Sequence, residues 1–131
     1  MTPVFVDAFF WIALLNKLDA SHNRVRNATR PKQLVTTVAV LLEVMDALSS
    51  VSMRRTAMRF WQRSFLNPRL EIVSLDKDLM DQAASLFGSR LDKAWSLTDC
   101  ISFTTMSDRG ITLALTGDHH YKQAGFEIAF P

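Results

Sequence analysis

Short apolar segments rich in β-branched residues alternate along the chain with longer segments whose apolar residues recur at helical spacing. The short segments predict strands at 4–6, 34–38, 71–75, 112–116 and 126–130. The longer ones predict helices at about 8–17, 20–29, 39–50, 53–66, 77–91, 97–108 and 119–124. Regular alternation of this kind favours a mostly parallel sheet of about five strands with helices on both faces, a three-layer α/β/α sandwich.

The ligand-binding edge of such a sheet follows from its topology, because ligands bind outside the carboxyl ends of the parallel strands. The segments "LVTTV" and "TLALT" are apolar enough to be central strands buried on both faces. The residues that directly follow each strand are therefore the first candidates for a site. The four glycines are scattered and form neither a GxGxxG nor a GxxxxGK[ST] loop, which argues against dinucleotide or P-loop binding.

The composition predicts one domain spanning 1–131, since 48% of the 131 residues are hydrophobic and 21% are charged. No apolar run approaches the roughly 18–20 residues of a membrane helix, and no signal peptide is evident at the N-terminus. The single cysteine, Cys100, cannot form an internal disulfide, so we expect a cytoplasmic protein. A net charge of +2 is too small to indicate nucleic-acid binding by itself.

Four acidic residues occupy positions next to the predicted strand ends, each in a different strand–helix unit. Asp7 directly follows the first strand, and Asp118 follows the fourth in "ALTGDHHY". Glu43 lies in the helix after the second strand, and Asp99 lies at the start of a strongly apolar helix in "WSLTDCISF". Carboxylates gathered without basic partners are stabilised by a divalent cation, and oxygen ligands suit Mg²⁺ or Mn²⁺.

Structural roles remain open for each of these acids taken singly. Asp7 and Asp118 also suit helix N-caps, and Ser96 with Asp99 matches a capping box. The helix around Glu43 is so apolar that it should be largely buried, with one polar stripe facing either solvent or a polar site; the stripe comprises Ala39, Glu43, Asp46 and Ser50. Caps alone explain the four positions less well, because Ser, Thr or Asn would serve equally there.

The segments that carry these acids resemble the PIN-domain family, in particular VapC-type toxin ribonucleases. The resemblance covers nearly the whole chain and rests on "FVDAFFWIAL", "TTVAVLLEVMDAL", "WSLTDCISFTTM" and "ALTGDHHYKQAGF" in this order. Its most specific part is "SLTDC" followed by the pattern T-x-D-x-x-[FY]-x-x-x-G-F. The resemblance implies a metal-dependent endoribonuclease that hydrolyses RNA phosphodiester bonds and serves as the toxin of a type II toxin–antitoxin pair.

The resemblance also implies a role for each matching residue. Asp7, Glu43 and Asp99 would be catalytic metal-binding carboxylates for Mg²⁺ or Mn²⁺, and Asp118 would complete a second metal position. Thr98 and Thr116 stand beside these acids and would hydrogen-bond a carboxylate or a phosphate, while Asp46 is treated as peripheral. Metal chemistry of this kind needs no imidazole. The remaining polar residues near the motifs are therefore expected away from the metal: His119 and His120 at the surface or behind the site, and His22 exposed.

A basic helix offers one way to hold RNA beside an acidic pocket. In "MRRTAMRFWQRSFL" the residues Arg55, Arg59 and Arg63 line the face opposite the apolar one. This stripe either guides phosphates or is simply the solvated face of an amphipathic helix. The resemblance implies a homodimer and a cognate antitoxin as protein partners.

Two competing hypotheses remain beside the nuclease. The first is a non-catalytic RNA- or protein-binding PIN-like module, against which the intact acids argue. The second is a receiver-like or phosphatase-like domain with an Asp phosphoacceptor. Such a domain needs a lysine suitably placed after the last strands, and Lys122 lies in a different sequence context.

Overall fold

The computed structural model describes residues 2–131 and contains one five-stranded sheet in the order β3-β2-β1-β4-β5. All neighbouring strands pair in parallel. The strands are β1 (Val4–Val6), β2 (Leu34–Thr37), β3 (Leu70–Val73), β4 (Leu113–Leu115) and β5 (Glu127–Ile128). The predicted α/β fold with about five parallel strands is confirmed.

The helices follow the predicted order along the chain. They are α1 (Ala8–Leu15), α2 (His22–Arg26), α3 (Val38–Ala47), α4 (Arg54–Leu66), α5 (Lys77–Ser89), α6 (Leu97–Asp108) and α7 (His119–Gln123), with a 3₁₀ turn at Val51–Met53 before α4. The longest of them, α4 and α5, have 13 residues each. No helix within residues 2–131 combines the length and the apolar character that crossing a bilayer requires.

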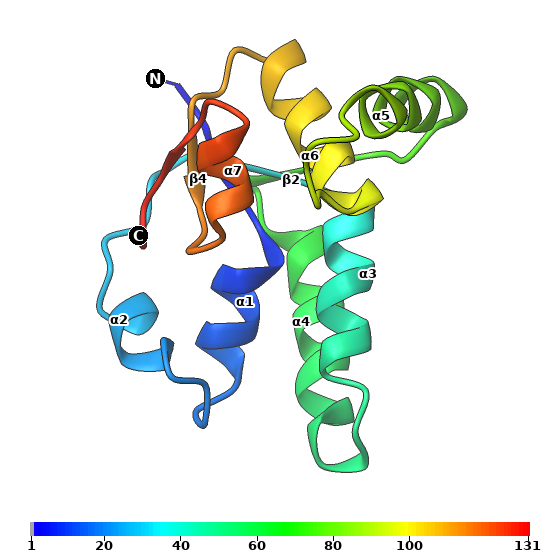
Figure 1. Cartoon of the computed structure of the whole chain (residues 1–131). Coiled ribbons are helices and arrows are strands. Elements are labelled where there is room, and N and C mark those ends of the chain that lie inside the picture. The colour runs from blue at the N-terminus through cyan, green and yellow to red at the C-terminus, as the bar shows by residue number, and fades with distance from the viewer. Residues whose placement is uncertain (1) are drawn as a thin grey trace.

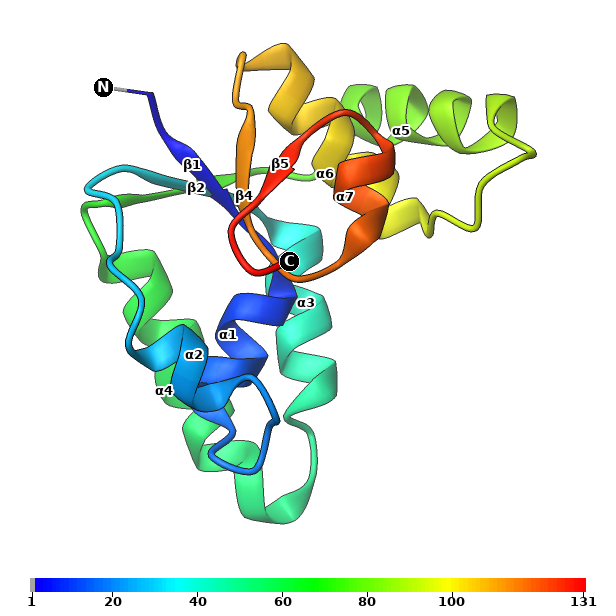
Figure 2. The same cartoon turned by 60° about the vertical axis from the view of Figure 1, so that its left-hand side comes forward.

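The sheet order places a topological switch point between β1 and β4. From β1 the chain moves outward to β2 and then β3, and α1 to α4 lie together on one side of the sheet (Figures 1 and 2). It then crosses back past β1 to β4 and β5, with α5 and α6 on the other side. Where two such halves diverge, the carboxyl ends of the central strands flank a crevice. Asp7 and Asp118 follow these two strands.

Strand ends differ from the predicted ones for a local reason. The second strand was expected to extend to residue 38, but Thr37 is the N-cap of α3 and its side chain accepts a hydrogen bond from the Val40 N–H. Val38 is therefore the first helical residue although its β-branched side chain favours a strand. The capping hydroxyl of Thr37 thus ends β2 and starts α3 one residue earlier than the strand preference of Val38 predicts.

The prediction that His22 is exposed is wrong. The side chain is buried, with a relative exposure of 9%, and its Nδ1 lies 2.7 Å from the Ala13 carbonyl oxygen. This contact joins the short helix α2 to α1, which is why a polar ring occupies an otherwise apolar position there.

The C-terminal segment covers the loop that carries Asp118. A Cβ atom placed on Gly117 would lie 2.7 Å from Phe9 Cζ and 2.9 Å from the Phe130 carbonyl oxygen. The Phe130 backbone cannot withdraw freely, because Arg24 donates hydrogen bonds to the carbonyl oxygens of Phe130 and Pro131. Glycine is therefore required by the close approach of two other segments.

We expect Gly117→Ala to destabilise the fold by about 1–3 kcal/mol, the usual cost of overpacking. Differential scanning calorimetry should show a melting temperature lower by roughly 3–9 °C. Gly88→Ala in α5 is the matched control, since nothing lies within 4 Å of a Cβ at that position. An unchanged melting temperature for Gly117→Ala would show that the C-terminal segment does not seal this loop.

Candidate active site

A threonine hydroxyl joins the two acids at the switch point. Asp7 directly follows β1, whose Val6 is in register with Leu115 of β4. Thr116 Oγ1 donates to Asp7 Oδ2 at 2.8 Å and accepts from the Asp118 N–H at 3.0 Å. The pairing of β1 with β4 thus fixes both acids at the same edge of the sheet.

Burial of the Asp7 side chain disfavours its ionised form. Its relative exposure is 7%, and burial raises the pKa of its carboxyl above the usual value, while the hydroxyl of Thr116 partly offsets this. Asp7 occupies the N-cap position of α1 but makes no side-chain capping hydrogen bond. Side-chain capping therefore does not account for this acid, whose hydrogen-bond partner is the Thr116 hydroxyl.

Asp99 and Asp118 do act as helix-end residues, in addition to lying at the crevice. Ser96 and Asp99 form the predicted capping box of α6, with the Asp99 N–H bonded to Ser96 Oγ and the Ser96 N–H bonded to Asp99 Oδ2. Asp118 is the N-cap of α7, where its Oδ1 accepts from the His120 N–H at 2.9 Å. These caps hold the carboxylates in fixed orientations.

Glu43 brings the fourth carboxylate from α3. Desolvation by the surrounding protein, together with smaller repulsions from Asp7, Asp99 and Asp118, raises the pKa of its carboxyl to about 7. Thr116 joins Asp7 to Asp118, and His120 joins Asp118 to Asp99, so the three aspartates lie side by side, with Glu43 near enough for their charges to act on it. The structure therefore gathers one carboxylate from each of four separate elements into one acidic site.

We expect the raised pKa of Glu43 to make the metal-free protein less stable as pH rises. Between the usual pKa of 4.5 and about 7, the folded state binds more protons than the unfolded state, so stability falls across this interval. Glu43→Gln should therefore match the wild type near pH 4 and exceed it at pH 8, by about 1 kcal/mol or less after solvent screening.

Thermal melts in EDTA from pH 4 to pH 8 measure this difference. Asp46→Asn is the control on the same helix, because Asp46 is exposed and is not among the charges that raise the pKa of Glu43. A Glu43→Gln advantage that is equal at both ends of the pH range would contradict the raised pKa of Glu43.

The surroundings of Glu43 differ from the prediction in one respect. We expected α3 to be largely buried except for a stripe that included Ala39, but Ala39 is buried while Leu42 is 47% exposed. Asp46 lies on the exposed side, as expected of a peripheral residue. Of the two predicted supporting threonines, Thr116 contacts Asp7, whereas no hydrogen bond joins Thr98 to the four acids within residues 2–131.

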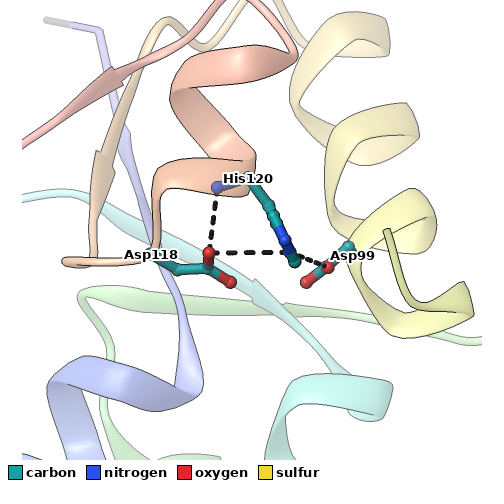
Figure 3. A group of neighbouring side chains, drawn as sticks. All are labelled: Asp99, Asp118 and His120. Atoms are coloured by element: carbon teal, nitrogen blue, oxygen red, sulfur yellow. Dashed lines mark hydrogen bonds and ion pairs between the residues drawn. The ribbon is translucent and has the colours of Figure 1, made fainter. Parts of the chain in front are cut away.

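His120 contacts two of the acids, which fits the expected position behind the site and not the expected position at the surface. Its Nδ1 lies 3.0 Å from Asp99 Oδ2 and 3.6 Å from Asp118 Oδ1. Figure 3 shows the imidazole ring between the two carboxylates. Its position two residues after Asp118 was the only available sequence signal, and the approach to Asp99 arises from the packing of α7 beside α6.

Tyr121 was also missed, because its place in the motif fits an apolar aromatic residue equally well. The side chain is wholly buried, and its hydroxyl has no hydrogen-bond partner of standard geometry in residues 2–131. The hydroxyl nevertheless lies close enough to Asp7 to lower the pKa of that carboxyl. A buried donor without an acceptor at the inner end of the site indicates that the protein alone leaves its polar interactions incomplete.

The donor set fits a hard or borderline divalent cation. Asp7 and Glu43 stand beside the group formed by Asp99, Asp118 and His120, and no Lys or Arg in residues 2–131 forms an ion pair with any of the five. Asp99, Asp118 and His120 each offer a ligand atom, and these atoms lie within 4.8 Å of one another. A buried carboxylate without a counter-charge is unfavourable, and a divalent ion held by oxygen ligands would offset that cost.

The predicted arginine stripe lies on a separate groove. Arg59 and Arg63 of α4 line a groove of about 670 Å³, together with Arg30 and Arg69 and with apolar side chains of α1. None of the four acids lines this groove, and Arg55 is exposed outside it. The structure therefore brings two of the three predicted arginines together, at a place distinct from the acidic site.

Comparisons with known proteins show which family the chain resembles in sequence and fold. The chain is 30% identical over 125 residues to the 23S rRNA-specific endonuclease VapC20 of Mycobacterium tuberculosis, covering 94% of this chain and 95% of the relative. The crystal structure of that protein, described as a sarcin–ricin loop cleaving toxin, matches with a TM-score of 0.90 at 29% identity over 98% of this chain and 99% of that one.

More distant solved structures share the fold. The DNA-bound VapBC structure from Salmonella typhimurium matches with a TM-score of 0.68 at 15% identity, covering 98% of this chain and 97% of the other. A sequence model of the PIN domain matches residues 4–127. The chain therefore belongs to the PIN domain family.

Proposed function

We propose that this protein is a divalent-metal-dependent endoribonuclease and the toxin of a toxin–antitoxin pair. The convergence of Asp7, Glu43, Asp99 and Asp118 from four elements is the observation that carries the proposal. Packing does not require carboxylates at these places, and their repulsion costs stability, so a functional role explains them better.

The four carboxylates would hold one or two ions of Mg²⁺ or Mn²⁺. A bound ion of this kind lowers the pKa of a water molecule and neutralises charge on the phosphate. Other contacts within the chain hold the carboxylates in place: Thr116 hydrogen-bonds Asp7, and the helix caps of α6 and α7 orient Asp99 and Asp118. No side chain needs to act as a nucleophile.

The substrate class comes from the relative in Mycobacterium tuberculosis, which cleaves 23S rRNA at the sarcin–ricin loop. We propose a structured ribosomal RNA as the target of this chain as well. Recognition of an RNA loop depends on contacts to unstacked bases and backbone phosphates, for which basic side chains around an acidic site are needed.

Protein partners are part of the same proposal. Several structural neighbours are toxin–antitoxin complexes, and we propose that a cognate antitoxin binds this chain and that the chain forms a homodimer. The arginine-lined groove between α1 and α4 offers both an apolar floor and positive charge, which suit either an acidic protein segment or RNA. The RNA-binding role of Arg55, Arg59 and Arg63 remains a prediction.

Expression in a bacterial host followed by mapping of RNA 5′ ends tests the function. We expect growth arrest and new 5′ ends at one or a few positions, with 23S rRNA as the first place to look. The same ends should be absent from cells that express Asp7→Asn. A non-catalytic binding module would give no new ends with either protein, and that outcome would favour the alternative.

A further inference from the structure

One nitrogen ligand lies among the carboxylates of the site. The Nδ1 atom of His120 is 3.0 Å from Asp99 Oδ2 and 3.6 Å from Asp118 Oδ1, as Figure 3 shows. The side chain is 32% exposed, so the ring lies at the mouth of the site where an ion can reach it. His120 is therefore positioned as a member of the site, and its backbone N–H also bonds Asp118.

These separations suit a shared metal ion. Neighbouring ligands of an octahedral ion at about 2.1 Å lie about 3 Å apart. One of the two nitrogen–oxygen distances equals this value and the other is 3.6 Å, so an ion bound by these three residues would require modest side-chain adjustments and an imidazole whose proton is on Nε2, which frees Nδ1 as a ligand. Both Asp99 and Asp118 are already oriented by their helix caps.

The carboxylate of Asp99 is arranged so that one oxygen remains free. Its Oδ2 receives both the Ser96 N–H and the His120 ring. Its other oxygen makes no hydrogen bond within residues 2–131. Asp99 can therefore offer its other oxygen to an ion, or share Oδ2 with the Ser96 N–H, without breaking its capping box.

The unpaired hydroxyl of Tyr121 is an independent sign that the site is completed by a ligand. It is wholly buried beside Asp7, and the charge of Asp99 also raises the pKa of Tyr121. Buried donors in native proteins are nearly always paired. The hydroxyl thus places a polar group that has no standard hydrogen-bond partner in residues 2–131 next to Asp7, on the buried side of the acidic site, near the similarly unpartnered hydroxyl of Ser102.

We propose that His120 supplies a nitrogen ligand to the metal position formed with Asp99 and Asp118, and that this position binds Mn²⁺ in preference to Mg²⁺. This inference rests on the proposed function. Mg²⁺ favours oxygen ligands and retains water, whereas imidazole nitrogen favours transition-metal ions. A carboxylate–carboxylate–imidazole set therefore shifts selectivity toward Mn²⁺.

Electron paramagnetic resonance of the full chain titrated with MnCl₂ tests this directly. Pulsed spectra at saturating Mn²⁺ should show hyperfine coupling to a histidine ¹⁴N nucleus in the wild type and in His119→Ala, and none in His120→Ala. His119 is the matched control because it is the exposed neighbour on α7. His120→Ala should weaken Mn²⁺ binding by about tenfold or more, and Mg²⁺ binding by less than about threefold.

The wild-type spectrum decides the matter even if His120→Ala fails to fold. Bound Mn²⁺ without ¹⁴N coupling, in a protein whose RNA cleavage still depends on Asp7, would overturn the nitrogen ligand and leave the proposed function standing. Absence of Mn²⁺ binding together with absence of RNA cleavage would overturn both. Coupling that persists in folded His120→Ala would assign the nitrogen to another residue and also overturn the proposal.

Discussion

Asp7→Asn is expected to lower the rate of RNA cleavage by at least about a thousandfold while making the metal-free protein more stable. Losing even one hydrogen-bond donor to a transition state costs about 10²–10³ in other enzymes, and a charged metal ligand should cost more. The amide retains an oxygen that can accept from Thr116, so the interaction that holds the side chain survives. The loss of cleavage should therefore come from the lost charge.

The gain in stability has a separate physical cause. Burial raises the pKa of Asp7, so ionisation of this side chain at neutral pH lowers the free energy of unfolding. The uncharged Asn side chain removes this cost. We expect a melting temperature a few °C higher in EDTA at pH 8. Opposite effects on activity and stability are typical of a functional charge that packing does not need.

Asp46→Asn is the control for this experiment. It removes an exposed acid from the same helix as Glu43 and should change neither cleavage nor melting by more than the error of measurement. If Asp7→Asn cleaved RNA at the wild-type rate, the catalytic assignment of Asp7 would be wrong. If it were less stable than the wild type without metal, the assumed burial cost of the charge would be wrong.

Chelation is expected to abolish cleavage, and readdition of MnCl₂ or MgCl₂ should restore it. The ion should also stabilise the fold, because it binds the four assembled acids and not the unfolded chain. At an ion concentration about 100 times the dissociation constant this amounts to about 2.7 kcal/mol. For a chain of this length the melting temperature should rise by roughly 8 °C.

Thermal melts of variants with and without the metal ion show which residues bind it. Glu43→Gln and Asp99→Asn should lose most of the metal-induced shift, whereas Asp46→Asn should retain it. Cleavage that persists in EDTA would exclude the metal mechanism. A shift that is equal in all variants would place the stabilising ion somewhere other than the acidic site.

The acids at the strand ends were predictable because their position depends only on the order of strands. Once β1 and β4 are recognised as buried parallel strands, Asp7 and Asp118 must lie at the carboxyl edge. Glu43 required the resemblance as well, since α3 presents Leu42 to solvent and periodicity alone did not show which face meets the site.

The features that the sequence did not reveal depend on contacts between distant segments. His120 approaches Asp99 only because α7 lies beside α6, and the buried place of His22 depends on a carbonyl oxygen of α1. Gly117 looks like an ordinary turn residue until Phe9 and the C-terminal backbone close over it. Local patterns carry no information about such pairings, so these residues needed the three-dimensional structure.

Crystals grown with MnCl₂ and measured near the manganese absorption edge offer the most direct test of whether the four acids form one metal site. We predict anomalous density within bonding distance of carboxylate oxygens from the four acids Asp7, Glu43, Asp99 and Asp118, with a peak at the position that Asp99 and Asp118 form with His120. At an ion concentration that supports cleavage, an anomalous map without a peak among these residues would contradict the proposed site.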